Sequence, residues 1–189
     1  MVKSKDNMSK ILYLHGFASC GEGNKSSELK NFFGADNVVA PDLPPSPLDA
    51  IRMIEEILKA TRFNVLAGSS LGGFYATYLA EKYSMKAILL NPSTQPWETL
   101  LPHLGWQKRF CDEEVFEFKS IYLEQLKTLQ TAPQKGKYLL LLQSGDEVLD
   151  YTKAQSLYNT HKIIVEYGGN HRFENIDEYL SMIEKFINK

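Results

Sequence analysis

The residues 63–72, FNVLAGSSLG, decide the fold of this chain. Their first half is an apolar strand-like run, and residues 68–72 fit the pattern G-x-S-x-G where that run gives way to a helix-like segment. A serine on such a sharp strand-to-helix turn adopts a strained backbone conformation and holds its hydroxyl clear of the sheet. The positions two before and two after it must be small, because the two backbones pass close together. The stretch therefore predicts that Ser70 is a nucleophile on a strand–turn–helix element.

Working outward, short apolar runs alternate with longer amphipathic ones. The runs predict strands at 11–14, 38–40, 63–67, 87–90, 138–142 and 163–167, and helices at 26–33, 48–60, 71–83, 153–159 and 176–188. Strands separated by helical crossovers indicate an α/β fold, with a parallel sheet covered on both faces. Right-handed crossovers then place the functional loops at the carboxyl ends of the strands.

One interval, 95–132, is too long for a simple crossover and reads as two helical pieces. We expect a small helical insertion that lies over the strand ends as a lid. A packed helical hairpin that completes the core is the alternative, because apolar stripes usually mark packing faces. The two interpretations are compatible, since one helix can pack with one face and line a pocket with the other.

The overall composition is that of an ordinary globular protein. The chain has 189 residues, of which 43% are hydrophobic and 23% charged, so we expect a single domain spanning 1–189. A net charge of −2 offers no field for nucleic acid. The N-terminal residues 1–10 are polar, and no apolar run approaches membrane-spanning length. Cys20 and Cys111 form no C-x-x-C pair, so we expect free thiols and a cytoplasmic location.

Ser70 needs a base, because a neutral hydroxyl is a weak nucleophile. Four histidines are available. His161 precedes the last strand, at the wrong end of the sheet, and His103 falls in the insertion, where a surface or packing role is expected. His15 directly follows the first strand and suits an organising role in its loop. His171 follows the last strand in the loop GGNHRF, on the same edge as Ser70, and is therefore the predicted base.

The imidazole needs a carboxylate to fix its tautomer and stabilise its charged form. Three candidates follow the strand at 138–142. Asp146 stands just past the strand end, beside a glycine, and is the preferred acid. Asp150 is expected to cap the next helix, and Glu147 is expected to be solvated. The preference for Asp146 rests on the chain order serine, acid, histidine.

An oxyanion in the transition state needs backbone donors. Leu71, which opens the helix after the nucleophile, is expected to supply one N–H. The second is expected from the loop after the first strand, where Gly16 permits close approach and the N–H of Phe17, or else of Ala18, is the candidate. A purely structural His-Gly turn is the alternative.

Together these residues resemble the α/β-hydrolase superfamily, and more narrowly the small bacterial YqiA-like esterases. The resemblance rests on YLHGF (13–17), PDLP (41–44), GSSLGGF (68–74), NP (91–92), QSGDEVLDY (143–151) and HRF (171–173). It implies a three-layer αβα hydrolase fold with a six-stranded, mostly parallel sheet in the order 2-1-3-4-5-6, numbered along the chain. It also implies a cytoplasmic serine esterase or thioesterase that acts on small-molecule acyl esters through a Ser70–His171–Asp146 triad. Within this framework Phe17, Phe74, Trp97 and Trp106 are candidate acyl-binding residues, although each could equally belong to the core.

Other functions fit the sequence less well. A phosphate-binding loop at 16–26 lacks both defining glycines, which are replaced by Ser19 and Asn24. Neither cysteine has the context of a nucleophile. No His/Asp/Glu cluster has the spacing of metal ligands, so we predict no metal and no cofactor. A catalytically inactive hydrolase fold used as a binding module remains the main alternative. The acyl chain, the leaving group and the oligomeric state are left open.

Overall fold

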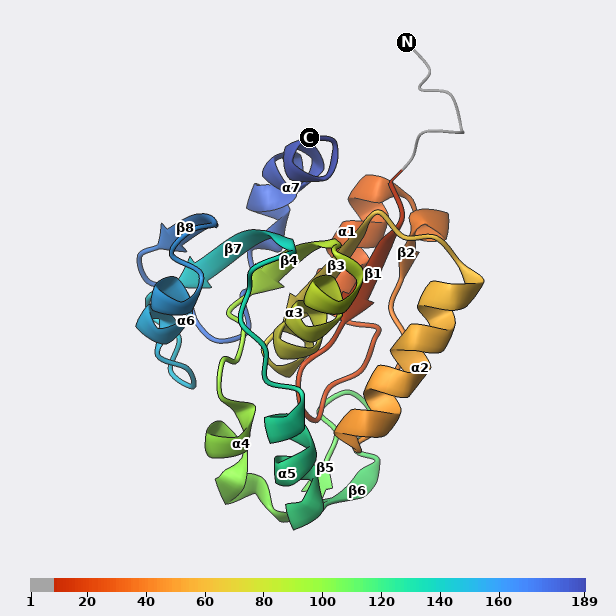
Figure 1. Ribbon diagram of the computed structural model, residues 1–189, viewed down its shortest axis with the longest axis vertical. Coiled ribbons are helices and arrows are strands. Elements are labelled where there is room, and N and C mark those ends of the chain that lie inside the picture. Colours follow the sequence, from red (N-terminus) through yellow and green to blue (C-terminus); the bar gives the residue numbers. More distant parts are fainter. Residues whose placement is uncertain (1–8) are drawn as a thin grey trace.

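The computed structural model describes residues 9–189 and shows a central sheet between two layers of helices (Figure 1). The prediction of a polar N-terminal stretch at 1–10 concerns mostly residues 1–8, which lie outside the described residues. Within residues 9–189, no helix combines the length and the apolar character needed to cross a bilayer.

The main sheet has six strands in the order β2-β1-β3-β4-β7-β8, and every neighbouring pair is parallel. The strands are β1 (Ile11–Leu14), β2 (Val38–Val39), β3 (Val65–Ser69), β4 (Lys86–Leu90), β7 (Lys137–Gln143) and β8 (Lys162–Glu166). Because β5 and β6 lie outside this sheet, its order along the chain is 2-1-3-4-5-6, as the resemblance implied. The expected fold class is confirmed.

Side chains alternate across the sheet and bury both of its faces, which explains why the strands are almost continuously apolar. Ile11, Tyr13 and Val65 pack on the face covered by α1 (Asn24–Phe33) and α7 (Leu180–Ile187). A 3-10 helix at Ile176–Tyr179 leads into α7. Leu12, Leu14 and Leu66 pack on the opposite face, which is covered by α2 (Pro47–Ala60), α3 (Leu71–Tyr83) and α6 (Tyr151–Leu157).

The interval 95–132 lies beyond the carboxyl ends of the strands, at the bottom of Figure 1. It contains α4 (Pro96–Thr99), a 3-10 helix (Leu101–His103), β5 (Gly105–Lys108), β6 (Val115–Phe118) and α5 (Ser120–Thr128). Both expected helical pieces are present, at 96–103 and 120–128, but the segment is not helical throughout, since β5 and β6 form an antiparallel hairpin between them. Short strands such as GWQK and VFEF hold too few residues for a periodicity to stand out between two helical runs.

Candidate active site

Ser70 occupies the turn between β3 and α3, and its backbone is strained. Its φ of 54° and ψ of −120° lie outside the conformations that a serine readily adopts. Hydrogen bonds on both sides hold this conformation. The Ser70 N–H donates to Leu90 O at 3.1 Å, and the Ser70 carbonyl accepts from the N–H groups of Gly73 and Ser93, both at 3.0 Å. The strain expected from the G-x-S-x-G pattern is therefore present.

The small residues on either side of Ser70 are required by close backbone contacts. A Cβ atom added at Gly72 would lie 2.0 Å from the carbonyl oxygen of Leu14 in β1. A Cβ added at Gly68 would lie 2.3 Å from the carbonyl oxygen of Gly72. Because neither backbone oxygen can move without shifting a strand or a helix, the turn accepts only glycine at these two positions.

His171 lies within hydrogen-bonding reach of both predicted partners. Its Nε2 is 3.0 Å from Ser70 Oγ, and its Nδ1 is 2.8 Å from Asp146 Oδ2. A carboxylate can only accept, so Nδ1 carries the proton and Nε2 is left to accept from the Ser70 hydroxyl. The Asp146 side chain is 1% exposed, whereas that of His171 is 20% exposed. The structure thus brings the three residues together in one chain of hydrogen bonds.

The three carboxylates that follow β7 have different partners. Asp146 Oδ1 also accepts from the N–H groups of Val148 and Leu149, at 2.9 and 2.8 Å, which fixes its orientation. Asp150 caps α6, where it accepts from the N–H of Thr152. Glu147 is exposed, and its Oε2 accepts from the backbone N–H of His171 at 2.9 Å, a bond that lowers the pKa of the Glu147 carboxyl. Only Asp146 contacts the His171 ring among these three.

The remaining histidines lie elsewhere. His161 contacts Pro133 O and the ring of Tyr138, and the exposed His103 lies against the ring of Phe17. His15 is buried: its Nδ1 donates to Gly16 O at 2.8 Å, and its Nε2 accepts from Leu43 N–H at 2.9 Å. Burial lowers the pKa of His15 and outweighs the opposing effect of the Gly16 carbonyl. Burial thus favours the neutral form of His15, whose ring ties the loops after β1 and β2 together.

The loop at 15–21, here called the β1 loop, runs beside Ser70. A Cβ atom added at Gly16 would lie 3.2 Å from Ser70 Cβ. Leu71 is the first residue of α3, so its N–H belongs to the free amino end of that helix. Ala18 has a φ of 52°, a left-handed conformation that is uncommon for a residue other than glycine. The two predicted oxyanion donors, Leu71 and Phe17, thus lie on the two segments that flank Ser70.

A cavity of 330 Å³ opens between the β1 loop, the loop after β2, α2, α3 and the β5–β6 hairpin. Phe17, Met53, Leu71, Tyr75 and Phe116 give it apolar walls, while Asp42, Arg109 and Glu114 bring charge to it. This volume is at the lower end for small-molecule sites.

The four aromatic residues predicted to bind the acyl group do not gather around that cavity. Phe17 lines it. Phe74 and Trp97 pack edge to face, and Phe74 lines a second cavity of 320 Å³. Trp106 is 73% exposed, because it lies on the outer face of β5. Within the described residues, Phe17 alone of the four lines the cavity beside the β1 loop.

A buried polar network behind His171 escaped the sequence reasoning. Asn91, which follows β4, donates from Nδ2 to Asn170 O and accepts from Gln143 N–H at 2.8 Å. Gln143, at the end of β7, accepts from Asn170 N–H at 2.9 Å and donates to Glu166 and Asn175, both at 2.7 Å. Both side chains are buried. The available signal was a polar residue directly after each of two apolar strands, at the edge that carries Ser70.

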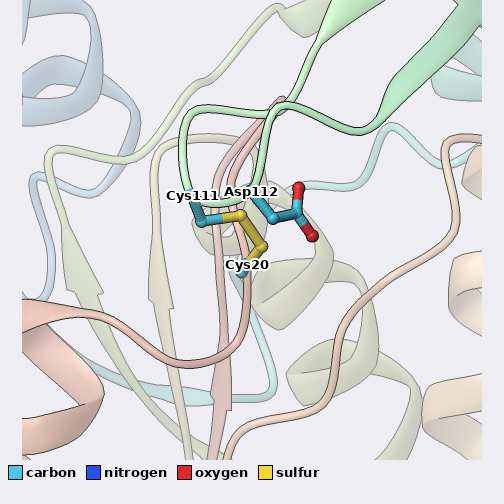
Figure 2. A group of neighbouring side chains, drawn as sticks. All are labelled: Cys20, Cys111 and Asp112. Atoms are coloured by element: carbon cyan, nitrogen blue, oxygen red, sulfur yellow. A yellow bond between two sulfur atoms is a disulfide. The ribbon is translucent and has the colours of Figure 1, made fainter.

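The cysteines are paired, contrary to the prediction of free thiols. Cys20 of the β1 loop is bonded to Cys111 of the hairpin turn, with the Cα atoms 6.2 Å apart and a sequence separation of 91 (Figure 2). Sequence spacing could not reveal the pair, because the insertion folds back onto the β1 loop. The cytoplasmic location stays a prediction, and the pairing removes one of its grounds.

The same cysteines and Asp112 are the one His/Cys/Asp/Glu group with metal-ligand spacing that we find within residues 9–189. As a disulfide, the two sulfurs are not thiolates and cannot serve as metal ligands. The absence of a metal from the reaction stays a prediction.

The sheet order and the strand–turn–helix position of Ser70 define an α/β-hydrolase fold. Solved structures agree. The mouse alpha/beta hydrolase domain-containing protein 10 has a TM-score of 0.77 at 15% identity, covering 96% of this chain and 90% of its own. The esterase domain of a Rhodothermus marinus protein has a TM-score of 0.71 at 16% identity, covering 96% and 88%.

Within that fold the sequence identifies a narrower group. The model of the uncharacterised protein family UPF0227 matches residues 10–188, and the chain belongs to this family. One relative is the UPF0227 protein YcfP of Salmonella paratyphi A, which is 26% identical over 184 residues, covering 93% of this chain and 97% of the relative.

Proposed function

We propose that this protein is a serine hydrolase that cleaves small-molecule acyl esters or thioesters through an acyl-enzyme intermediate. The observation that carries the proposal is the continuous chain of hydrogen bonds from Ser70 Oγ through the His171 ring to Asp146. A serine, an imidazole and a buried carboxylate in this order meet the geometric requirement for an activated hydroxyl nucleophile.

Each residue has a role that follows from its contacts. His171 Nε2 takes the proton as Ser70 Oγ attacks the acyl carbon, and returns it to the leaving group. Asp146 keeps the Nδ1–H tautomer and stabilises the imidazolium that forms. The N–H groups of Leu71 and Phe17 hold the developing oxyanion. Water, activated by His171, then attacks the acyl-enzyme and releases the acid.

The 330 Å³ cavity is the proposed acyl site. It adjoins the β1 loop, so an acyl chain bound there would leave its carbonyl beside Phe17 and Leu71. Its apolar walls suit a short hydrocarbon chain. Phe74, Trp97 and Trp106 contribute indirectly or not at all, whereas the insertion acts as the cover of the site through the hairpin residue Phe116.

A fluorophosphonate probe tests the nucleophile directly, because it forms a covalent bond with an activated serine. We expect labelling of the folded wild type that is lost in Ser70→Ala and retained in Ser156→Ala, a matched control on the exposed surface of α6. A panel of esters and acyl thioesters of graded chain length then defines the leaving group and the reach of the acyl site. Folded wild type that neither reacts with the probe nor hydrolyses any panel member would contradict the hydrolase proposal and favour the inactive binding module.

A further inference from the structure

We propose that the Cys20–Cys111 disulfide is a thiol–disulfide exchange site whose oxidised form holds the β1 loop in its working conformation. The inference rests on the proposed function, because the β1 loop carries the oxyanion donor Phe17. The reactant that it implies is a dithiol or disulfide of the surrounding redox pool.

The β1 loop holds an unfavourable conformation at Ala18, one residue after Phe17 and two before Cys20. Such a conformation persists only where neighbouring contacts impose it. The Ala18 carbonyl accepts from the N–H of Phe110, the residue before Cys111, at 2.8 Å. The hydrogen bond and the disulfide therefore both join residues 110–111 of the hairpin turn to residues 18–20 of the β1 loop.

Ionic and aromatic contacts supplement these fastenings. Arg109 in the hairpin turn forms ion pairs with Glu114 at 2.9 Å, with Asp112, and with Asp42 in the loop after β2 at 3.6 Å. The ring of Phe17 packs edge to face against Phe116 and Phe118 of β6, with centroids 5.7 and 5.0 Å apart. Because these contacts do not need the disulfide, we expect reduction to loosen the β1 loop and not to unfold it.

The pair is open to exchange. Cys111 is exposed and Cys20 is half-buried. Figure 2 shows Cys111 and Asp112 on the hairpin turn, with the disulfide joining Cys111 to Cys20. A thiolate of the reductant attacks Cys111 Sγ, the S–S bond breaks, and Cys20 leaves as a thiolate that takes up a proton. The second thiol of the reductant then displaces Cys111 from the mixed disulfide. The protein gains two electrons and two protons, and the dithiol becomes a disulfide.

The test compares turnover and amide exchange in oxidised and reduced protein. Wild type is treated with dithiothreitol in the presence of EDTA, and kcat and KM are measured on an ester that the wild type cleaves. We expect kcat to fall by roughly 10- to 100-fold with a smaller change in KM, somewhat less than the loss of an oxyanion donor outright. Re-oxidation should restore turnover. Cys20→Ser/Cys111→Ser should resemble reduced wild type and ignore dithiothreitol.

Hydrogen–deuterium exchange provides a readout that does not need activity. Reduction should raise exchange at the amides of residues 17–20 and 109–114 and leave β3 and β4 unchanged. Turnover and exchange that are both insensitive to reduction would overturn the inference. A protein without hydrolase activity in either state would refute the proposed function, whereas its exchange would still show whether the disulfide holds the loop.

A metal is the competing use of the same residues, since both thiolates and Asp112 become available after reduction. Zn²⁺ is therefore added to the reduced protein in place of EDTA. Recovery of full turnover with Zn²⁺ alone would overturn disulfide exchange as the switch, and unchanged low turnover supports it.

Discussion

The Ser70 turn and the His171 loop are held in place by different means, although their side chains meet at 3.0 Å. The Ser70 turn is held by its own backbone, with glycines pressed against β1 and α3 and hydrogen bonds to the ends of neighbouring strands. The His171 loop is held by side chains, chiefly Asn91 and Gln143, that come from other strands.

This difference explains how much of the site the sequence could predict. Close contacts between adjacent backbones require small residues at fixed sequence positions relative to the nucleophile, so they produce a sequence pattern such as G-x-S-x-G. Side-chain support gathers from distant segments and leaves no fixed spacing. Strand polarity pointed to His171 and the chain order of serine, acid and histidine to Asp146, but no such rule pointed to the residues that hold the His171 loop. The following predictions test this contrast, from the largest expected effect to the smallest.

The contact between the two regions depends most on Asp146. In Asp146→Asn the amide donates where the carboxylate accepted, so the His171 ring loses the Nδ1–H tautomer. We expect kcat to fall by about 10⁴-fold while the fold is retained. Steady-state kinetics and circular dichroism check this. Asp150→Asn, at the cap of α6, is the matched control, and equal losses in the two variants would contradict the assignment of the acid.

A single methyl group added at Gly72 should destabilise the Ser70 turn. In Gly72→Ala the new Cβ would meet Leu14 O at 2.0 Å, and we expect the free energy of unfolding to fall by about 3 kcal/mol. Urea unfolding measures the change. Gly23→Ala is the control, because a Cβ there meets nothing within 4 Å. A Gly72→Ala variant with wild-type stability and turnover would contradict the prediction that the backbone contacts of the turn exclude a Cβ atom at this position.

The His171 loop should respond to the loss of one buried amide. Gln143→Leu leaves Asn170 N–H without a partner and removes one hydrogen bond each from Glu166 and Asn175, so we expect a loss of about 1–3 kcal/mol in the free energy of unfolding. The misplaced imidazole should also lower kcat by roughly 10²-fold. Gln155→Leu, on the exposed face of α6, is the control. A positioning role predicts a change in kcat with KM nearly constant, whereas equal changes in both would argue against it.

His15, which lies in the β1 loop beside Ser70, should make the free energy of unfolding depend on pH. Burial lowers its pKa below the ordinary 6.5, so the unfolded chain binds a proton more readily than the folded one. The contribution of neutral His15 to the free energy of unfolding is therefore fully present above about pH 6.5. It is lost as the pH falls toward the pKa of His15 in the folded state, by at most about 1.4 kcal/mol per pH unit.

Urea unfolding of wild type and His15→Gln between pH 5 and 7 measures this dependence. Glutamine cannot titrate, so the slope should be smaller in the variant, and His103→Gln controls for the loss of an exposed imidazole. An unchanged slope in His15→Gln would contradict the prediction.

The fold itself was more predictable than the segment that covers it. All six strands of the main sheet were expected, because apolar runs and helical crossovers repeat along the chain, and the resemblance to α/β-hydrolases implied their order. The β5–β6 hairpin and the Cys20–Cys111 pair were not. Both depend on how residues 95–132 fold back onto the β1 loop, and contacts between such distant segments are not encoded in local periodicity.

Both tryptophans of the chain lie in this segment, and their surroundings differ. Trp97 packs against Phe74, while Trp106 is exposed on β5. A Trp97→Phe variant therefore keeps a single tryptophan, Trp106 on the hairpin, and selectively excited tryptophan fluorescence would report on the hairpin in real time without an attached dye. Trp106 is thus an intrinsic fluorescent probe of the β5–β6 hairpin.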